Sequence, residues 1–204
     1  MDRVAPFVEA LVQRFNAVVS VDTSTPDVMR ESARLGAAII NDVRSLRRDG
    51  AMQAAAETEM AVCVLHMRGG PQTMQNAPHY NDVGLEVAEF LRERVDACLA
   101  AGISKDRLMI DPGFGFAKTL AHNLELFKRM PELHSFDLPL LVGVSRKTMI
   151  GQILDRPVNE RLYGSLGLAM MALERGASII RVHDVAATAD IVKVFQAVVT
   201  AGEV

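Results

Sequence analysis

Tryptophan is absent from the 204-residue sequence, and cysteine and tyrosine occur only twice each. The cysteines, Cys63 and Cys98, are far apart in apolar surroundings, with neither the density of a disulfide scaffold nor the paired spacing of a zinc site. We therefore expect both to be reduced packing residues.

The sequence also lacks long apolar runs and an excess of basic residues. No stretch approaches the roughly 20 apolar residues that span a bilayer, and no basic start followed by an apolar run and a cleavage site is present. With 22 basic and 25 acidic residues the net charge is −3, so no general attraction to nucleic acid or anionic membranes is expected. These absences predict a cytoplasmic protein with neither kind of partner.

What is present is typical of a globular protein, with 50% hydrophobic and 23% charged residues. A chain of this size buries roughly 70% of the surface that it exposes when unfolded. No linker or low-complexity run divides it. We expect residues 1–204 to form a single domain.

Six short apolar runs, rich in β-branched residues, each end in a polar residue, at 17–22, 38–41, 61–66, 107–111, 140–145 and 178–183. Continuous apolar runs are typical of buried parallel strands. Helical patterns lie between them, for example at 26–35, 85–100, 123–130, 148–154, 165–175 and 188–199, and the apolar stripe of residues 4–15 predicts a helix at the start. The alternation predicts an α/β fold.

The strand ends recur about every 32 residues, the size of one βα unit. Two architectures fit: a doubly wound open sheet, or a (β/α)₈ barrel with only about six βα units, lacking the first two. Both place their sites at the carboxyl ends of strands. Neither a dinucleotide-binding nor a P-loop glycine motif separates them.

Polar side chains follow the first three predicted strands. Asp22 ends a buried strand, where a carboxylate is costly unless it is paired or faces a ligand, so we favour a functional role. Asn41 and Asp42 either close their strand with a turn or contribute to a site. Met67, after His66, either fills a core gap or lies flat on an aromatic ligand.

The fourth strand ends at Asp111, which enters a loop with two glycines, a proline, Phe114 and Phe116. A carboxylate there is suited to accept two N–H bonds from a flat heterocycle beside an aromatic wall. A packing loop is the simpler alternative. We favour the binding role because the proline and glycines give the loop a defined backbone conformation, which a loop that is only exposed to solvent does not need.

Positive charge gathers after the last two strands. Arg146 and Lys147 follow Ser145 and precede a predicted helix, where cations oppose the helix dipole unless an anion or polar ligand is present. Arg181 and His183 are two residues apart and so share one face of the last strand. A structural ion pair is the rival interpretation of Arg181.

Together these motifs resemble the dihydropteroate synthase family, in the family's order and across nearly the whole chain: Val21-Asp22-Thr23, Ile40-Asn41-Asp42, His66-Met67-x-Gly69 through Thr73-Met74-Gln75, Asp111-Pro112-Gly113-x-Gly115-Phe116, Ser145-Arg146-Lys147 and Arg181-Val182-His183-Asp184. The resemblance implies a pterin-binding (β/α)₈ TIM barrel. It also implies a cytoplasmic homodimer that condenses 6-hydroxymethyl-7,8-dihydropterin pyrophosphate with p-aminobenzoate, using Mg²⁺, in folate biosynthesis.

The same resemblance assigns roles to residues. The pterin would be held by Asp22, Asn41, Met67, Asp111, Phe116, Gly143 and Lys147. The p-aminobenzoate and pyrophosphate would contact Phe116, Ser145, Lys147, Arg181 and His183. Asp111, Lys147, Arg181 and His183 would be the catalytic residues.

The sequence departs from the family pattern in two places. The loops of the family's first two βα units, one of which carries the magnesium-binding Asn, do not occur, so no metal ligand is expected in this chain. Ala117 stands where a glycine is usual, which would stiffen its loop.

We expect an open six-stranded barrel that self-associates or is unstable. The alternatives are a pterin-binding methyltransferase domain and a non-catalytic pterin-binding remnant.

Overall fold

The computed structural model describes residues 3–69 and 78–201. Within them six strands form: β1 (Ser20–Asp22), β2 (Ile39–Asp42), β3 (Ala61–Leu65), β4 (Leu108–Asp111), β5 (Leu141–Val142) and β6 (Ile179–Ile180). The first four form one parallel sheet in chain order, β5 and β6 form a parallel pair, and a bridge between Ile110 and Leu140 joins the two. All six predicted strands are confirmed; five have shorter bounds, and β2 is shifted by one residue toward the C-terminus.

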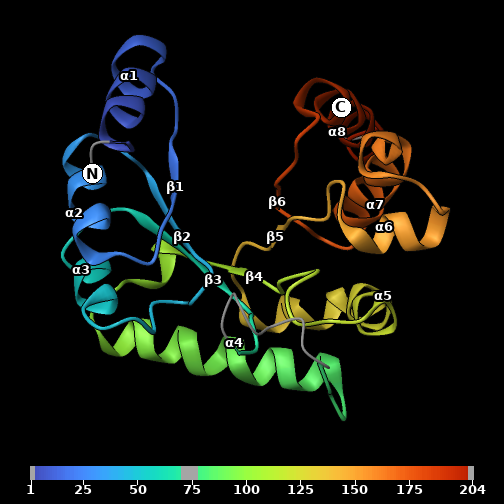
Figure 1. Cartoon of the computed structure of the whole chain (residues 1–204), viewed down its shortest axis with the longest axis horizontal. Coiled ribbons are helices and arrows are strands. Elements are labelled where there is room, and N and C mark those ends of the chain that lie inside the picture. The colour runs from blue at the N-terminus through green and yellow to red at the C-terminus, as the bar shows by residue number, and fades with distance from the viewer. Residues whose placement is uncertain (1–2, 70–77, 202–204) are drawn as a thin grey trace.

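The helices lie on the outside of the strands (Figure 1). They are α1 (Ala5–Phe15), α2 (Pro26–Arg34), α3 (Ala51–Ala56), α4 (Val83–Ala100), α5 (Leu120–Lys128), α6 (Thr148–Leu154), α7 (Leu162–Glu174) and α8 (Val185–Val199). Short 3₁₀ helices cover Lys105–Arg107, Met130–Phe136 and Val158–Glu160. The ribbon forms an arc that is open between α1 and β1 on one side and β6 and α8 on the other.

The strand order decides between the two architectures. A doubly wound sheet reverses its strand order and carries helices on both faces. Here the order follows the chain without reversal. The large apolar core joins helix residues with the outward strand side chains, whereas the other face holds a small cluster made only of strand residues: Cys63, Met109 and Leu141, packed with Ile39, Ala61 and Ile179. The fold is of the (β/α)₈ barrel type, with six units and an unclosed ring.

The helix α3 was not predicted, because its sequence is mostly alanine and has no apolar periodicity. Its buried alanines, Ala51, Ala54 and Ala55, belong to the main core. The starts of α4, α5, α7 and α8 lie two or three residues before their predicted positions. Polar first turns explain part of this difference, as at Asp82, whose side chain accepts from the N–H of Leu85 at 2.8 Å.

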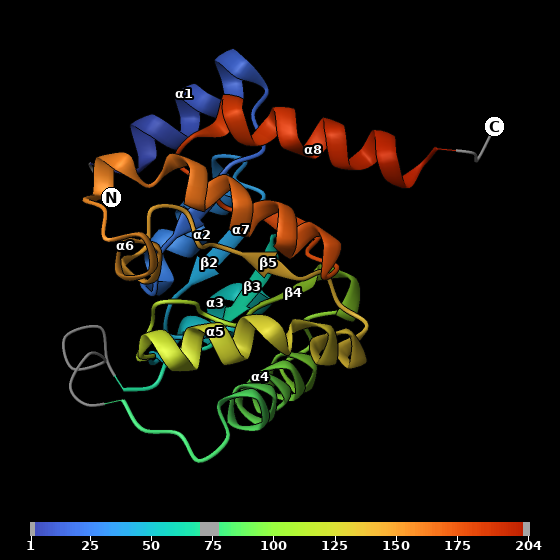
Figure 2. The ribbon, with the colours of Figure 1, turned by 90° about the vertical axis from the view of Figure 1, so that its right-hand side faces the viewer.

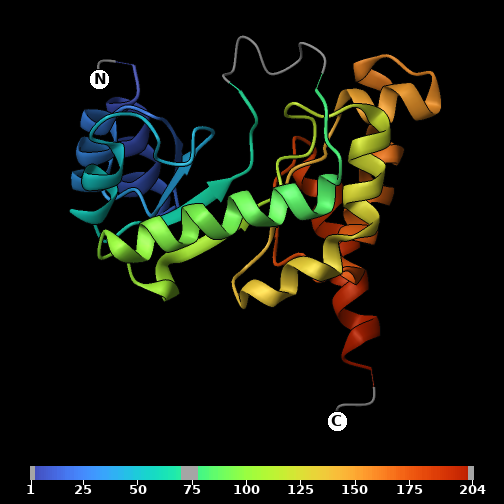
Figure 3. The same cartoon turned by 90° about the horizontal axis from the view of Figure 1, so that it is seen from below.

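The end of the chain projects from this body. In Figures 2 and 3 the C-terminal part of α8 extends beyond the other elements. Its side chains Val194, Val198 and Val199 are exposed, as are Phe7 and Phe15 on α1. Within the described residues, no helix is both long and apolar enough to cross a membrane.

Candidate active site

The interior face of the sheet carries a set of polar side chains next to the small apolar cluster. We call Asn41, Asp111 and Arg181 the polar group. Asn41 in β2 and Asp111 in β4 are both buried, at 5% and 1% exposure. Arg181, just after β6, donates to Asp111 Oδ2 at 2.8 Å and to Asn41 Oδ1 at 3.2 Å. The last strand therefore reaches across the sheet to two others, and three predicted site residues meet at one point.

Gly143, which follows β5, makes this reach possible. A Cβ atom at Gly143 would lie 2.8 Å from Arg181 Nη2 and 3.0 Å from its Nε. Any side chain there would displace the guanidinium from Asp111. The predicted site residue Gly143 therefore lies beside Arg181, on the floor of the polar group.

Asp22 belongs to the same edge of the sheet. It lies opposite Asn41 in the register of β1 and β2. Loss of water around its carboxyl raises the pKa of Asp22, whereas the Asn41 side chain and the charge of Arg181 lower it. Asp42, the next residue after Asn41, is instead structural: it accepts from the N–H groups of Arg44 and Leu46, each at 2.9 Å, and from the Ser24 hydroxyl.

The loop after β4 is shaped by its glycines. Asp111 Oδ1 accepts from the N–H of Gly113 at 2.8 Å, so one carboxylate oxygen holds the loop while the other holds Arg181. Gly113 has a φ of +70°, and a Cβ there would lie 1.9 Å from the carbonyl oxygen of His66. Ala117, which stands where the family usually has a glycine, adopts a φ of +50°. This backbone conformation favours glycine, so the alanine strains the backbone locally.

Lys147 extends from the start of α6 over this loop. Its Nζ lies 4.5 Å from the centre of the Phe116 ring and donates to the carbonyl of Phe114. Burial lowers the pKa of Lys147 to about 8, against the opposing effect of Asp111. Phe116 and Lys147 line a cavity of about 740 Å³, together with Pro78, Thr148 and Arg161 among others.

Ser145 and His183 also meet. The His183 Nδ1 atom lies 3.0 Å from the Ser145 hydroxyl, which accepts from the His183 N–H at 3.2 Å. Arg146 has an internal partner, because its Nε donates to Asp184 Oδ2 at 2.9 Å. The cations before α6 are therefore partly balanced within the chain, which the sequence did not indicate.

Met67 follows β3, next to His66, whose N–H donates to the backbone carbonyl of Asp111 at 2.9 Å. Met67 is buried at 1% exposure and lines a separate cavity of about 340 Å³ with His66, Arg47 and Phe90. The remainder of its motif, Thr73-Met74-Gln75, lies outside the described residues.

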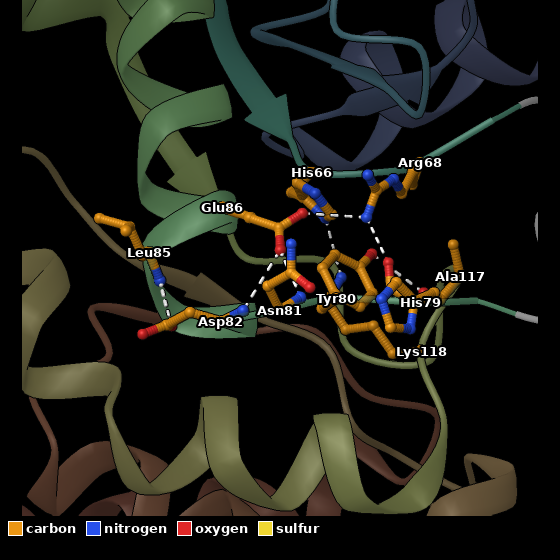
Figure 4. Close-up of polar contacts among 10 residues, drawn as sticks. All are labelled: His66, Arg68, His79, Tyr80, Asn81, Asp82, Leu85, Glu86, Ala117 and Lys118. Atoms are coloured by element: carbon orange, nitrogen blue, oxygen red, sulfur yellow. Dashed lines mark hydrogen bonds and ion pairs between the residues drawn. The ribbon is translucent and has the colours of Figure 1, made fainter.

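Lys118 is a buried charged residue that was not predicted from the sequence. Its side chain is at the base of the loop after β4, and its neighbours include His66 and Tyr80 (Figure 4). A lysine directly after an apolar and glycine-rich stretch was the available signal. As for metals, within residues 3–69 and 78–201 no group of three or more His, Cys, Asp or Glu side chains is arranged to hold an ion.

This set of groups can be compared with known proteins. A family model described as pterin binding enzyme matches residues 1–183. The dihydropteroate synthase of Escherichia coli strain K12 is 54% identical over 203 residues, covering 100% of this chain and 72% of that protein. The chain belongs to the dihydropteroate synthase family. The resemblance drawn from the six motifs is confirmed, and the relatives favour a synthase over a methyltransferase.

Solved dihydropteroate synthase structures share the fold. The Yersinia pestis enzyme, in a sulfonamide drug complex, superposes with a TM-score of 0.96 at 50% identity, covering 98% of this chain and 73% of that one. The Xanthomonas albilineans enzyme with 4-aminobenzoic acid gives a TM-score of 0.91 at 46% identity, covering 97% and 70%. These structures confirm that the fold is of the barrel type. They also confirm that the chain belongs to a family of transferases.

Proposed function

We propose that this chain joins the pterin methylene carbon of 6-hydroxymethyl-7,8-dihydropterin pyrophosphate to the amino nitrogen of p-aminobenzoate. The carbon–oxygen bond to pyrophosphate breaks, the carbon–nitrogen bond forms, and the amine loses a proton. One observation carries the proposal: a guanidinium from the segment after β6, a carboxylate from β4 and an amide from β2 converge on the interior face, at Arg181, Asp111 and Asn41. Such a set is suited to a hydrogen-bonding heterocycle next to a polyanion.

In this proposal the pterin contacts Asp22, Asn41, Met67, Asp111, Phe116, Gly143 and Lys147. Asp111 accepts from the ring N–H and amino groups, and the Lys147 ammonium donates to the ring carbonyl. Carboxylates beside the pterin stabilise the positive charge that develops on the methylene carbon when pyrophosphate leaves. The support is their buried, preorganised arrangement, with Asp111 held from two sides.

The leaving pyrophosphate contacts Arg181 and His183. A departing polyanion requires fixed positive charge, which Arg181, the most exposed side chain of the polar group, supplies. Its side chain is 39% exposed, so solvent and an anion reach the guanidinium while it pairs with Asp111. The p-aminobenzoate is placed at Phe116, Ser145 and Lys147, supported by the 740 Å³ cavity and by the relative that binds 4-aminobenzoic acid.

Magnesium is a separate proposal. Among the described residues, no group of three or more His, Cys, Asp or Glu side chains is arranged to hold an ion without a substrate. Mg²⁺ is usually bound by one or two carboxylates together with substrate phosphates. We propose that it accompanies the pyrophosphate, and we assign no step of the reaction to it.

The homodimer and the cytoplasmic location are also proposals. They rest on membership in the family and, for association, on the exposed apolar side chains of α1 and α8.

The proposed reaction is tested by pyrophosphate release. The 204-residue chain is incubated with the pterin pyrophosphate, p-aminobenzoate and Mg²⁺, beside Lys147→Ala and the control Lys128→Ala, which alters an exposed lysine at the end of α5. We expect release that depends on p-aminobenzoate, falls by about 10²-fold or more in Lys147→Ala and is unchanged in Lys128→Ala.

Two outcomes would contradict this proposal. Pterin binding without pyrophosphate release by the folded chain would instead support the non-catalytic remnant. Equal release by the wild type and Lys147→Ala would remove Lys147 from the reaction.

A further inference from the structure

A buried lysine holds the loop that carries the proposed pterin and p-aminobenzoate contacts. Lys118 is 5% exposed, and its Nζ atom lies 2.9 Å from His66 Nδ1, 2.9 Å from the carbonyl oxygen of Gly113 and 3.2 Å from that of Phe116. An ammonium has three N–H donors. Lys118 therefore has three acceptors, two of which are loop carbonyls between Asp111 and itself.

The protonation state of His66 agrees with this geometry. Burial and the nearby charge of Lys118 lower the pKa of His66 to about 2, so His66 is neutral and its Nδ1 accepts from the lysine. Burial also lowers the pKa of Lys118 to about 7, while Asp111 opposes the change. Lys147 also acts on Lys118 and lowers its pKa further.

A second contact fixes the same loop from the segment before α4. The Tyr80 hydroxyl donates to the carbonyl of Ala117 at 3.0 Å (Figure 4). Arg68 lies over the Tyr80 ring at 5.0 Å and pairs with Glu86 at 2.9 Å. Glu86 in turn accepts from the N–H of Asn81 at 2.8 Å. The segments after β3 and β4 are thus bound to each other below the site.

We propose that Lys118 is a positioning residue, whose ammonium holds the loop of residues 111–118 so that Asp111 and Phe116 stand in binding geometry. The inference deepens the proposed function and rests on it. Lys118 acts through the loop backbone, since the carbonyl of Gly113 follows Asp111 by two residues and that of Phe116 belongs to the aromatic wall itself.

The energetics distinguish positioning from general stabilisation. Lys118→Met removes the cost of burying an ammonium but leaves two loop carbonyls and His66 Nδ1 without their donor, so the two effects on the free energy of unfolding oppose each other. A methionine has about the length of lysine and no charge. We therefore expect Lys118→Met to retain the fold and lose the loop geometry.

The test compares the wild type with Lys118→Met, Lys118→Gln and the exposed control Lys128→Met. Calorimetric titration with 6-hydroxymethylpterin measures the pterin Kd, and circular dichroism measures the melting temperature. We expect the Kd to rise at least 10-fold in Lys118→Met without a matching fall in melting temperature. Lys118→Gln, which keeps donors for the two carbonyls, should recover part of the affinity, and Lys128→Met should match the wild type.

Other results would overturn the inference. Wild-type affinity in folded Lys118→Met would show that the ammonium does not position the loop. Failure of both Lys118 variants to fold would make the lysine a requirement of the whole fold instead of a local support, which also contradicts the proposal. Absence of pterin binding by the folded wild type would overturn the proposed function, and the inference with it.

Discussion

Several charged side chains around the interior face have partners within the chain. Arg181 holds Asp111, Arg146 holds Asp184, and Lys118 faces His66. The ion pair at Arg181 was the rival interpretation of this residue, and it is present. It does not exclude anion binding, because the guanidinium is 39% exposed whereas its partner is 1% exposed. In the proposed complex Asp111 would bind the pterin and Arg181 the pyrophosphate. The ion pair already holds both side chains in position before the ligands bind.

A pH effect on stability follows from His66. Its pKa is lowered to about 2 in the folded chain, against about 6.5 when unfolded. Between these values the unfolded chain binds a proton that the folded chain does not, so the free energy of unfolding falls as pH decreases below about 6.5. At pH 5 the loss from this group is about 2 kcal/mol.

The measurement is the urea midpoint at pH 7 and pH 5. We expect the midpoint to fall less in His66→Gln than in the wild type, because glutamine has no proton to gain. The control His79→Gln changes an exposed histidine and should fall as the wild type does. A His66→Gln variant that loses as much stability between the two pH values as the wild type would contradict the assignment.

At the level of elements, the six strands were predictable because parallel strands are continuous apolar runs that end in polar residues, whereas their order in the sheet was left open between two architectures and came from the structure. The convergence of Asn41, Asp111 and Arg181 was predictable only in part. Strand ends gather at one edge of any such sheet, but which guanidinium reaches which carboxylate depends on side-chain packing around Gly143. Helix starts and α3 were missed because caps and alanine-rich turns carry no apolar period.

The loop after β4 passes so close to His66 at Gly113 that only a glycine fits there without a shift. Gly113 has a φ of +70°, which residues with a side chain rarely adopt. An added Cβ atom would also lie 1.9 Å from the His66 carbonyl oxygen. We expect Gly113→Ala to lower the free energy of unfolding by about 3 kcal/mol or more, from backbone strain and overpacking together. Pterin affinity should fall as well, since the backbone of Gly113 binds Asp111.

Gly102→Ala is the matched control. Gly102 also has a positive φ, +90°, but no atom lies within 4 Å of an added Cβ. Only the backbone conformation is strained there, which predicts a loss of about 1 kcal/mol. Urea unfolding of the two variants separates the contributions, and equal losses would show that the approach to His66 is relieved by a small shift of the loop.

At the scale of the whole molecule, the six-unit arc leaves β1 and β6 as outer strands in the described part of the chain. Outer strands with unpaired backbone groups promote association. Exposed apolar side chains flank both: Phe7 and Phe15 on α1 are each 72% exposed, and Val198 on α8 is 70% exposed. Together these features support the expectation that the chain self-associates or is unstable.

Sedimentation velocity over a range of protein concentrations measures this association. We expect the wild type to sediment faster as concentration rises, and the double variant Phe7→Ser/Phe15→Ser to do so less, with little change in melting temperature because both rings are already in solvent. Tyr163→Ser is the control, since Tyr163 is 84% exposed at the start of α7 and is not one of the side chains to which we attribute the association. A wild type that remains monomeric at every concentration, with a high melting temperature, would show that the open barrel is self-sufficient and that its edges are protected.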